Sequence, residues 1–196
     1  CGQRGQRAES LAKLIATSKG KPNTVSYGSP GNGSTPHLAV ELFARAAGID
    51  LLHVPYKGGP PALNDVLAGH VQAVAVNALE VQPHVKAGRL RMLAVVDDKR
   101  YSELPAVPTQ REALPGFSPK TSWLGVFGPA KLPPAIATRL SAELQKAAQD
   151  PQLSHYLNTN GMPVVGSTGE EFAKRLREDV EGWTPIVRAG NIAATD

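Results

Sequence analysis

The chain has 196 residues, enough to bury a core and to form one large or two small domains. Its content of 41% hydrophobic and 19% charged residues is ordinary for a folded globular protein, and no apolar run is long enough to cross a membrane. The net charge of +4 does not indicate nucleic-acid binding, because the basic residues are scattered and only 5% of the chain is aromatic. A single cysteine, Cys1, excludes an internal disulfide and a cysteine-cluster metal site.

Helices and strands are predicted to alternate through the first part of the chain. Residues 1–7 are expected to be an unstructured leader, and residues 8–18 a helix. Strands are then expected at Val25–Tyr27, Leu51–Tyr56, Val71–Val76 and Leu90–Val96, with helices after Pro36, from Pro60 and around Leu79–Ala87. The run Val71–Val76 is apolar at nearly every position, which is typical of a strand buried on both faces of a parallel sheet. This order predicts an α/β domain with a mainly parallel sheet.

The second part of the chain has a different character. Residues 97–120 are rich in proline and polar residues, with one short helix expected over Thr109–Leu114. After the apolar run Trp123–Phe127, three helices are expected, the last starting at Ser167 with Glu170 at the spacing of a capping box. Three helices with very little strand cannot easily close a core of their own. We therefore expect them to cover a sheet that is mostly absent from this chain.

The most informative segment is the glycine-rich turn between the first strand and its helix, YGSPGNGSTPH over residues 27–37. Thr35 suits an N-cap and Pro36 a first helical residue, so the amides of the first helical turn should be unpaired and face the turn. Unpaired N–H groups at the positive end of a helix dipole bind anions. The groups expected to hold a carboxylate or phosphate are the backbone amides of Gly31, Asn32 and Gly33 and the hydroxyls of Ser29, Ser34 and Thr35.

Two further side chains are expected to line this site. His37 falls in the first helical turn, and Asn77 follows the strand Val71–Val76, where open α/β sheets place ligand contacts. For Asn77, helix capping is an equally good interpretation. His53 falls in a strand and is expected to be a core or edge residue. No histidine pair has metal-ligand spacing, the local pattern suggests no carboxylate partner for any histidine, and neither a metal nor a cofactor is predicted.

Enzymatic motifs are incomplete in the same turn. Gly28 and Gly33 have the spacing of a phosphate-binding loop, but Ser34 stands where the lysine is required. A serine-hydrolase elbow at Ser29 lacks its first glycine, which is replaced by Tyr27. Because these motifs are incomplete, an α/β enzyme acting on a carboxylated or phosphorylated metabolite is only the alternative function. It requires a base within reach of Ser29.

Several segments together resemble the Bug family, the TctC-type extracytoplasmic receptors of tripartite tricarboxylate transporters. They are YGSPGNGSTPHL from Tyr27, HVPYKG from His53, LAV from Leu93 followed by Lys99-Arg100, LPAVPT from Leu104, WLGVFGP from Trp123, and the segment from Trp183 to Asn191. The resemblance runs from about Ala8 to Asn191 in the family's order.

This resemblance implies a periplasmic binding protein of the type II, Venus-flytrap class, whose two α/β lobes close on a small carboxylic acid. It implies no catalysis and no cofactor, with the membrane components of the transporter as partners. The loop from Ser29 to Thr35 would hold the ligand carboxylate. Asn77 stands where an aspartate is common, and the lost negative charge favours a ligand without an amino group.

The resemblance also predicts the domain organisation. Residues 8–122 would be the family's second lobe, and residues 123–196 the C-terminal helices of the first lobe, whose N-terminal portion is missing. We therefore expect weak or absent ligand binding by this polypeptide alone, and exposed apolar surface that promotes a homodimer. Two origins of Cys1 are open, the acylated cysteine of a processed lipoprotein and, preferred here, the edge of a cloned or predicted gene.

Overall fold

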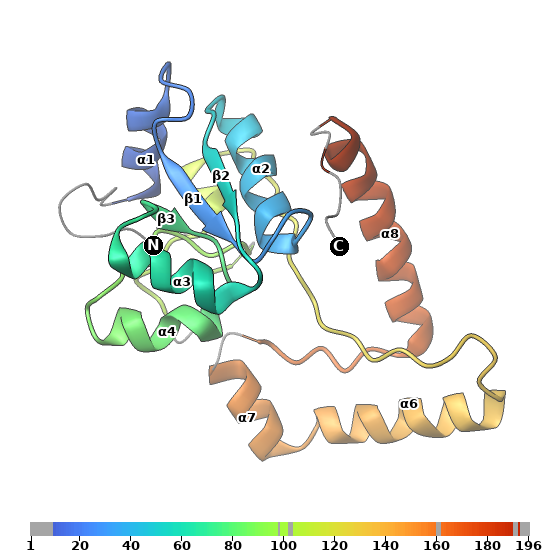
Figure 1. Ribbon diagram of the computed structural model, residues 1–196. Coiled ribbons are helices and arrows are strands. Elements are labelled where there is room, and N and C mark those ends of the chain that lie inside the picture. Colours follow the sequence, from blue (N-terminus) through green and yellow to red (C-terminus); the bar gives the residue numbers. More distant parts are fainter. Residues whose placement is uncertain (1–9, 98, 102–103, 160–161, 190–191, 193–196) are drawn as a thin grey trace. The chain divides into compact units, whose positions relative to one another are not determined.

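The computed structural model describes residues 10–97, 99–101, 104–159, 162–189 and 192 (Figure 1). The predicted leader at residues 1–7 lies outside this part. The elements, in chain order, are α1 (Leu11–Ser18), β1 (Ser26–Ser29), α2 (Thr35–Ala47), β2 (Leu52–Pro55), α3 (Gly59–Ala68), β3 (Ala73–Val74), α4 (Ala78–Lys86), α5 (Gln110–Ala113), α6 (Pro134–Ala148), α7 (Pro151–Thr159) and α8 (Gly169–Ala189).

The described residues form two compact units. One comprises those within Cys1–Thr121 and Ile186–Asp196, and the other comprises those within Ser122–Pro185. The boundary therefore crosses α8 at Pro185, which lies inside that helix. The assignment of these parts to two lobes of a larger receptor stays a prediction.

The first unit contains a parallel sheet with the strand order β2-β1-β3. Tyr27 of β1 lies opposite His53 of β2, and Gly28 lies opposite both Val54 of β2 and Val74 of β3. Each strand is followed by a helix, so the carboxyl ends of the three strands and the N-termini of α2, α3 and α4 meet at one edge of the sheet (Figure 1). The predicted α/β class with a parallel sheet is confirmed.

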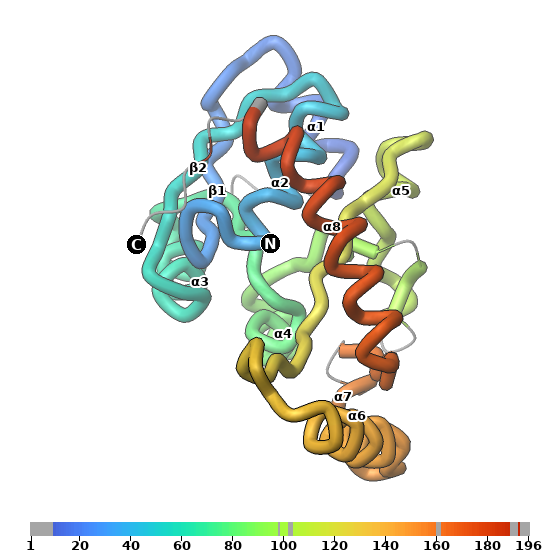
Figure 2. Tube along the Cα trace, turned by 90° about the vertical axis from the view of Figure 1, so that its right-hand side faces the viewer, coloured from blue at the N-terminus to red at the C-terminus, as the bar shows by residue number. Residues whose placement is uncertain are grey.

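Side chains of β1 alternate between the two faces of the sheet, as the pleat requires. Tyr27 faces α2, where its hydroxyl donates to Glu41, whereas a Cβ atom on Gly28 would meet Ala62 of α3. Helices α1 and α2 thus cover one face, and α3 and α4 cover the other (Figures 1 and 2). The buried clusters are Leu63, Val66, Val71, Val81 and Leu90 on the α3 side, and Leu11, Phe43 and Phe117 with Leu14, Ala44 and Ile49 on the α1 side.

Two strand predictions were wrong in extent. The run Val71–Val76 forms only the two-residue strand β3, which pairs with β1, and the chain then turns into α4 after Asn77. The run Leu90–Val96 forms an isolated bridge between Val95 and Thr109. The backbone of Val95 is engaged by Pro108 and Gln110, so this segment pairs with the start of α5 and does not extend the sheet.

Two predicted helix starts were wrong by one residue: that of α2 was one residue too late, and that of α8 one residue too early. The N-cap of α2 is Ser34, since its carbonyl accepts the first helical bond from Leu38 N at 3.0 Å, and Thr35 is already helical. The capping box of α8 uses Thr168 and Glu171 in place of Ser167 and Glu170, with Glu171 N donating to Thr168 Oγ1 at 3.2 Å.

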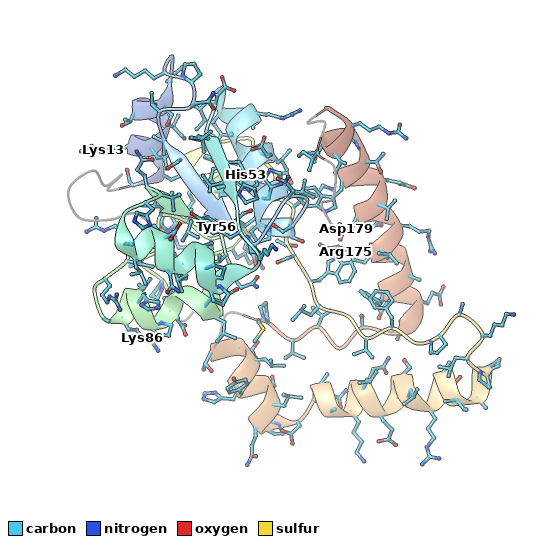
Figure 3. The ribbon with its side chains drawn as sticks, in the orientation of Figure 1. Lys13, His53, Tyr56, Lys86, Arg175 and Asp179 are labelled. Atoms are coloured by element: carbon cyan, nitrogen blue, oxygen red, sulfur yellow. The ribbon has the colours of Figure 1, made fainter. Side chains whose placement is uncertain are left out.

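The described part of the second unit consists of α6, α7 and most of α8 with their connecting segments. Trp123, Phe127 and Phe172 pack together, with the Trp123 and Phe172 rings 4.8 Å apart and perpendicular. Trp123 Nε1 and Arg175 Nε both donate to Asp179 Oδ2, and Figure 3 shows Arg175 and Asp179 on α8. Large exposed apolar side chains in this unit are Leu124, Val126, Phe127, Ile136, Leu140, Leu144, Leu153, Tyr156, Val165, Leu176 and Val180.

Among the residues that the structure describes, no helix has both the length and the hydropathy that crossing a bilayer requires.

Candidate ligand-binding site

Three helices begin without a side-chain cap at the carboxyl edge of the sheet. The N-cap residues of α2, α3 and α4 are Ser34, Gly58 and Asn77, and none accepts a hydrogen bond from the first helical turn through its side chain. The first-turn amides of a helix have no partner within the helix itself. The segment from Pro30 to Ser34 leads directly into the N-terminus of α2, where the partial charge of the helix is positive.

The loop after β1 is held by hydrogen bonds to its own backbone carbonyls. Ser34 Oγ donates to the carbonyl oxygen of Gly31 at 2.7 Å, so this hydroxyl is not a helix cap. Gly31 and Gly33 have φ angles of 144° and 72°, which glycine adopts without steric cost. The carbonyl of Pro30 accepts from the Gly58 amide at 3.0 Å, which ties the loop to the start of α3.

The predicted amide donors divide into engaged and open groups. Gly31 N donates to Ser29 Oγ at 3.2 Å, and Gly33 N donates to His37 Nδ1 at 3.1 Å, so both act within the protein. In the part of the chain that the structure describes, the amides of Asn32, Thr35 and His37 have no hydrogen-bond partner. Pro36 has no N–H group. Asn32 and Thr35 are half-buried, whereas His37 is buried.

A polar group of five side chains, buried or half-buried, lies behind the loop. Ser29 Oγ is 2.7 Å from His53 Nε2, and the rings of His53 and His37 stack with centroids 3.8 Å apart. The hydroxyl of Tyr27 donates to Glu41 Oε1 at 3.0 Å, and His37 Nε2 lies 3.9 Å from the same oxygen. The expectation that no histidine has a carboxylate partner was therefore wrong, since Glu41 is one helical turn from His37.

Burial keeps both imidazoles neutral at neutral pH. Desolvation, aided by the neighbouring His37, lowers the pKa of His53 to about 4. Desolvation also lowers the pKa of His37, against the opposing effect of the Glu41 carboxylate. Burial and the same carboxylate raise the pKa of Tyr27 well above its ordinary value, so its hydroxyl stays a donor. The prediction of His53 as a core residue missed its contact with Ser29.

Asn77 is connected to the loop through the start of α3. Its side-chain amide donates to Glu80 Oε1 at 3.2 Å, and the Glu80 carboxylate packs so closely on Gly59 that a Cβ atom there would overlap it. Gly58, beside Gly59, donates to the loop carbonyl of Pro30. Asn77 was expected to leave its position without negative charge, but Glu80 supplies a carboxylate one turn later. Asn77 and Glu80 have the spacing of a capping box, which could have indicated their contact, whereas no sequence spacing indicates the contact of Glu80 with Gly59.

Metal binding has no support in the described ranges, which contain no group of three or more His, Cys, Asp or Glu side chains that could hold an ion.

The fold defines the class of protein. The solved structures that resemble this chain include "Structure of a periplasmic transporter", with a TM-score of 0.82 and 28% identity over 97% of this chain and 64% of that chain. They also include "Structure of periplasmic binding protein BugD", with a TM-score of 0.79. At 23% identity BugD shows the fold alone. The chain therefore has the fold of periplasmic binding proteins.

The family follows from the sequence comparison. Residues 5–192 match the Tripartite tricarboxylate transporter family receptor, TctC, and the chain belongs to this family of solute-binding proteins. It is 35% identical to the UPF0065 protein in the tcbD-tcbE intergenic region of Pseudomonas sp. (strain P51), over 92% of this chain and 54% of the relative. It is 32% identical to Protein BugT of Bordetella pertussis (strain Tohama I / ATCC BAA-589 / NCTC 13251), over 93% of this chain and 56% of the relative. The chain thus spans about half the length of these curated relatives.

A further solved structure, "R. palustris Rpa4515 with adipate", has a TM-score of 0.89 and 30% identity to this chain. The similarity covers 98% of this chain and 64% of that chain.

Proposed function

We propose that this chain is part of an extracytoplasmic receptor that binds a small carboxylic acid for a tripartite tricarboxylate transporter. The observation that carries the proposal is the set of open amides at Asn32, Thr35 and His37, around the N-terminus of α2. A ligand carboxylate has two oxygens that can accept from several of these donors at once. Hydrogen bonds to a charged group contribute about 1.5–3 kcal/mol each, enough to select an anion over a neutral solute.

The ligand class is supported by similarity as well as by chemistry. Rpa4515, whose structure is described with adipate, is 30% identical to this chain, and adipate is a linear dicarboxylate. We propose that one carboxylate lies at the loop, with Ser29, Gly31, Gly33 and Ser34 shaping the site and Asn32, Thr35 and His37 donating to the ligand. Asn77 would then present its carbonyl oxygen to the ligand, because its amide nitrogen is engaged by Glu80.

The remaining features of the proposal follow from family membership. We propose a periplasmic location, the membrane components of the transporter as partners, and no catalytic activity. We also propose that the exposed apolar side chains of the second unit promote a homodimer, which light scattering during size-exclusion chromatography tests directly. A monomer at every protein concentration would contradict the dimer.

The alternative, an α/β enzyme acting on a carboxylated or phosphorylated metabolite, has one observation in its favour. His53 Nε2 lies 2.7 Å from Ser29 Oγ, so a base is within reach of the candidate nucleophile. Ser29 is, however, 0% exposed, and its oxygen already accepts from the Gly31 amide. A substrate carbonyl cannot reach a hydroxyl that is fully covered by protein, so the geometry favours binding over nucleophilic attack.

The decisive experiment is an NMR titration of the ¹⁵N-labelled chain with adipate and other mono- and dicarboxylates. Shifts of the Asn32, Thr35 and His37 amides are expected to saturate together, including at the weak affinity expected of this chain. A panel of carboxylates that leaves these three signals unmoved would contradict the proposal. Turnover of an ester or phosphoester that disappears in Ser29→Ala would support the enzyme.

A matched pair of glycine variants controls for backbone strain. Gly33 and Gly20 both have φ of 72°, and a Cβ atom at Gly20 would meet no other atom within 4 Å. Each change to alanine forces a left-handed residue, at a cost of about 1–2 kcal/mol in stability. Only Gly33→Ala is expected to weaken carboxylate binding. Equal binding by both variants would count against a role for the loop.

A further inference from the structure

The anion-binding loop is held from behind by two histidines that come from different elements. His37, in the first turn of α2, accepts from the Gly33 amide through Nδ1 at 3.1 Å. His53, on β2, contacts Ser29 Oγ through Nε2 at 2.7 Å, and Ser29 Oγ accepts from the Gly31 amide. The engaged amides of Gly31 and Gly33 are thus fixed, through Ser29 and directly, by stacked imidazoles. Figure 3 labels His53 on its strand.

The two contacts respond differently to a proton. An imidazole nitrogen accepts a hydrogen bond only when it carries no hydrogen, so the bond from Gly33 requires a neutral His37 with its hydrogen on Nε2. Protonation of His37 places N–H against N–H at this contact. The hydrogen bond that holds Gly33 in position is then lost. His53 retains its contact in either state, because Ser29 Oγ can accept from a protonated ring while donating to the Gly31 carbonyl at 3.2 Å.

We propose that His37 is the positioning residue of the carboxylate loop, with His53 as its support, and that the loop holds its open amides in place only while Nδ1 of His37 accepts from Gly33. For its consequence on ligand affinity, this inference rests on the proposed function. The role is structural support for donors that contact the ligand, in addition to the donation by His37's own backbone amide.

The surroundings of His37 define how this support responds to acid. The groups facing it are Glu41 on its own helix, His53 on β2, and Tyr27 on β1, whose hydroxyl shares the Glu41 oxygen. The carboxylate favours a protonated His37, whereas burial, with His37 only 4% exposed, opposes it. The support therefore holds at neutral pH and fails in acid.

The first test compares His37→Asn, His37→Leu and the exposed control His155→Asn. Asparagine places an oxygen acceptor near the position of Nδ1 and cannot be protonated, whereas leucine offers no acceptor. We expect His37→Leu to bind adipate about 2- to 10-fold more weakly at neutral pH, the loss of one hydrogen bond, and His37→Asn to bind within about twofold of the unmodified chain. His155→Asn should match the unmodified chain throughout.

The pH profile separates support from simple packing. The ratio of the dissociation constants of the unmodified chain and His37→Asn cancels the titration of adipate itself. Because burial lowers the pKa of His37 from its ordinary value, we expect this ratio to be near one at about pH 8 and to rise in acid as the ring is protonated, since only the histidine then loses its acceptor. A ratio that stays constant while NMR signals of the ring show that His37 has become protonated would overturn the inference.

A second measurement needs neither ligand nor variant. An N–H···N hydrogen bond gives a scalar coupling between its two nitrogens, so the ¹⁵N-labelled chain should show a coupling between Gly33 N and His37 Nδ1 that vanishes as the ring is protonated. Absence of this coupling at neutral pH would overturn the inference even if carboxylates bind. If no carboxylate binds but the coupling is present, the proposed function fails while the support of the loop by His37 stands.

Discussion

Replacement of Thr35 by proline should remove one anion donor without disturbing the fold. Thr35 is the first helical residue of α2, a position that proline favours, and its amide has no hydrogen-bond partner among the described residues. The preceding residue, Ser34, has φ −63° and ψ 150°, the extended conformation that a residue before proline prefers. Thr35→Pro should therefore leave the free energy of unfolding unchanged or raise it by about 0.4–1 kcal/mol.

The effect on binding should be large by comparison. Loss of one hydrogen bond to a carboxylate costs about 1.5–3 kcal/mol, which weakens the dissociation constant about 10- to 150-fold. Thr35→Ala is the matched control, because it removes the hydroxyl and keeps the amide. The assay is the NMR titration with adipate, together with thermal unfolding of each variant. If Thr35→Pro is stably folded and binds within about twofold of the unmodified chain, the amide does not contact the ligand and the reasoning fails.

Three further changes test the fold around the site. Val66 is 0% exposed in the cluster between α3 and the sheet, so Val66→Ala should lower the free energy of unfolding by about 2 kcal/mol. A loss within error of zero in denaturant titrations would contradict this packing. Gly59→Ala should cost about 1–3 kcal/mol because the new Cβ overlaps the Glu80 carboxylate, and Glu80→Ala in the same chain should restore much of the loss; simple additivity would refute this contact. Hydrogen bonding from Arg100 and the capped backbone hold the pKa of Glu112 at about 2, so its stabilisation is full above the ordinary glutamate pKa and is lost as pH falls toward 2. Glu112→Gln should therefore be less stable than the unmodified chain near neutral pH and converge with it in acid, and parallel stability curves would argue against the ion pair.

The strand–helix order and the loop could be predicted because their signals are local. Glycines at positions of positive φ and the proline after the turn mark the loop, and Gly48 and Gly69 mark the ends of α2 and α3. The N-cap of α2 was misplaced by one residue because Ser34 and Thr35 are both good caps. Ser34 is the N-cap through its extended backbone and its carbonyl, which accepts from Leu38 N, whereas its hydroxyl donates to the Gly31 carbonyl.

The polar group behind the loop could not be predicted because it depends on strand register. Alternation along a strand predicts which side chains share a face, but a shift of one residue between strands reverses the pairing. Only the observed register, with Tyr27 opposite His53, brings this histidine beside Ser29 and under His37. The contact of Glu80 with Gly59 is missing from the prediction for a related reason, since it requires the position of α3 beside α4.

The central place of β1 in the sheet has a consequence for selectivity. A strand paired on both sides exchanges its amide hydrogens only in rare openings, so the chain enters the loop from its most protected segment. A loop that is already ordered loses little conformational entropy when an acid binds, and its donors cannot follow a ligand of the wrong shape. Selectivity at this end of a ligand should then depend on how its carboxylate fits the fixed donors. The length of the ligand's carbon chain should be recognised by other parts of the receptor.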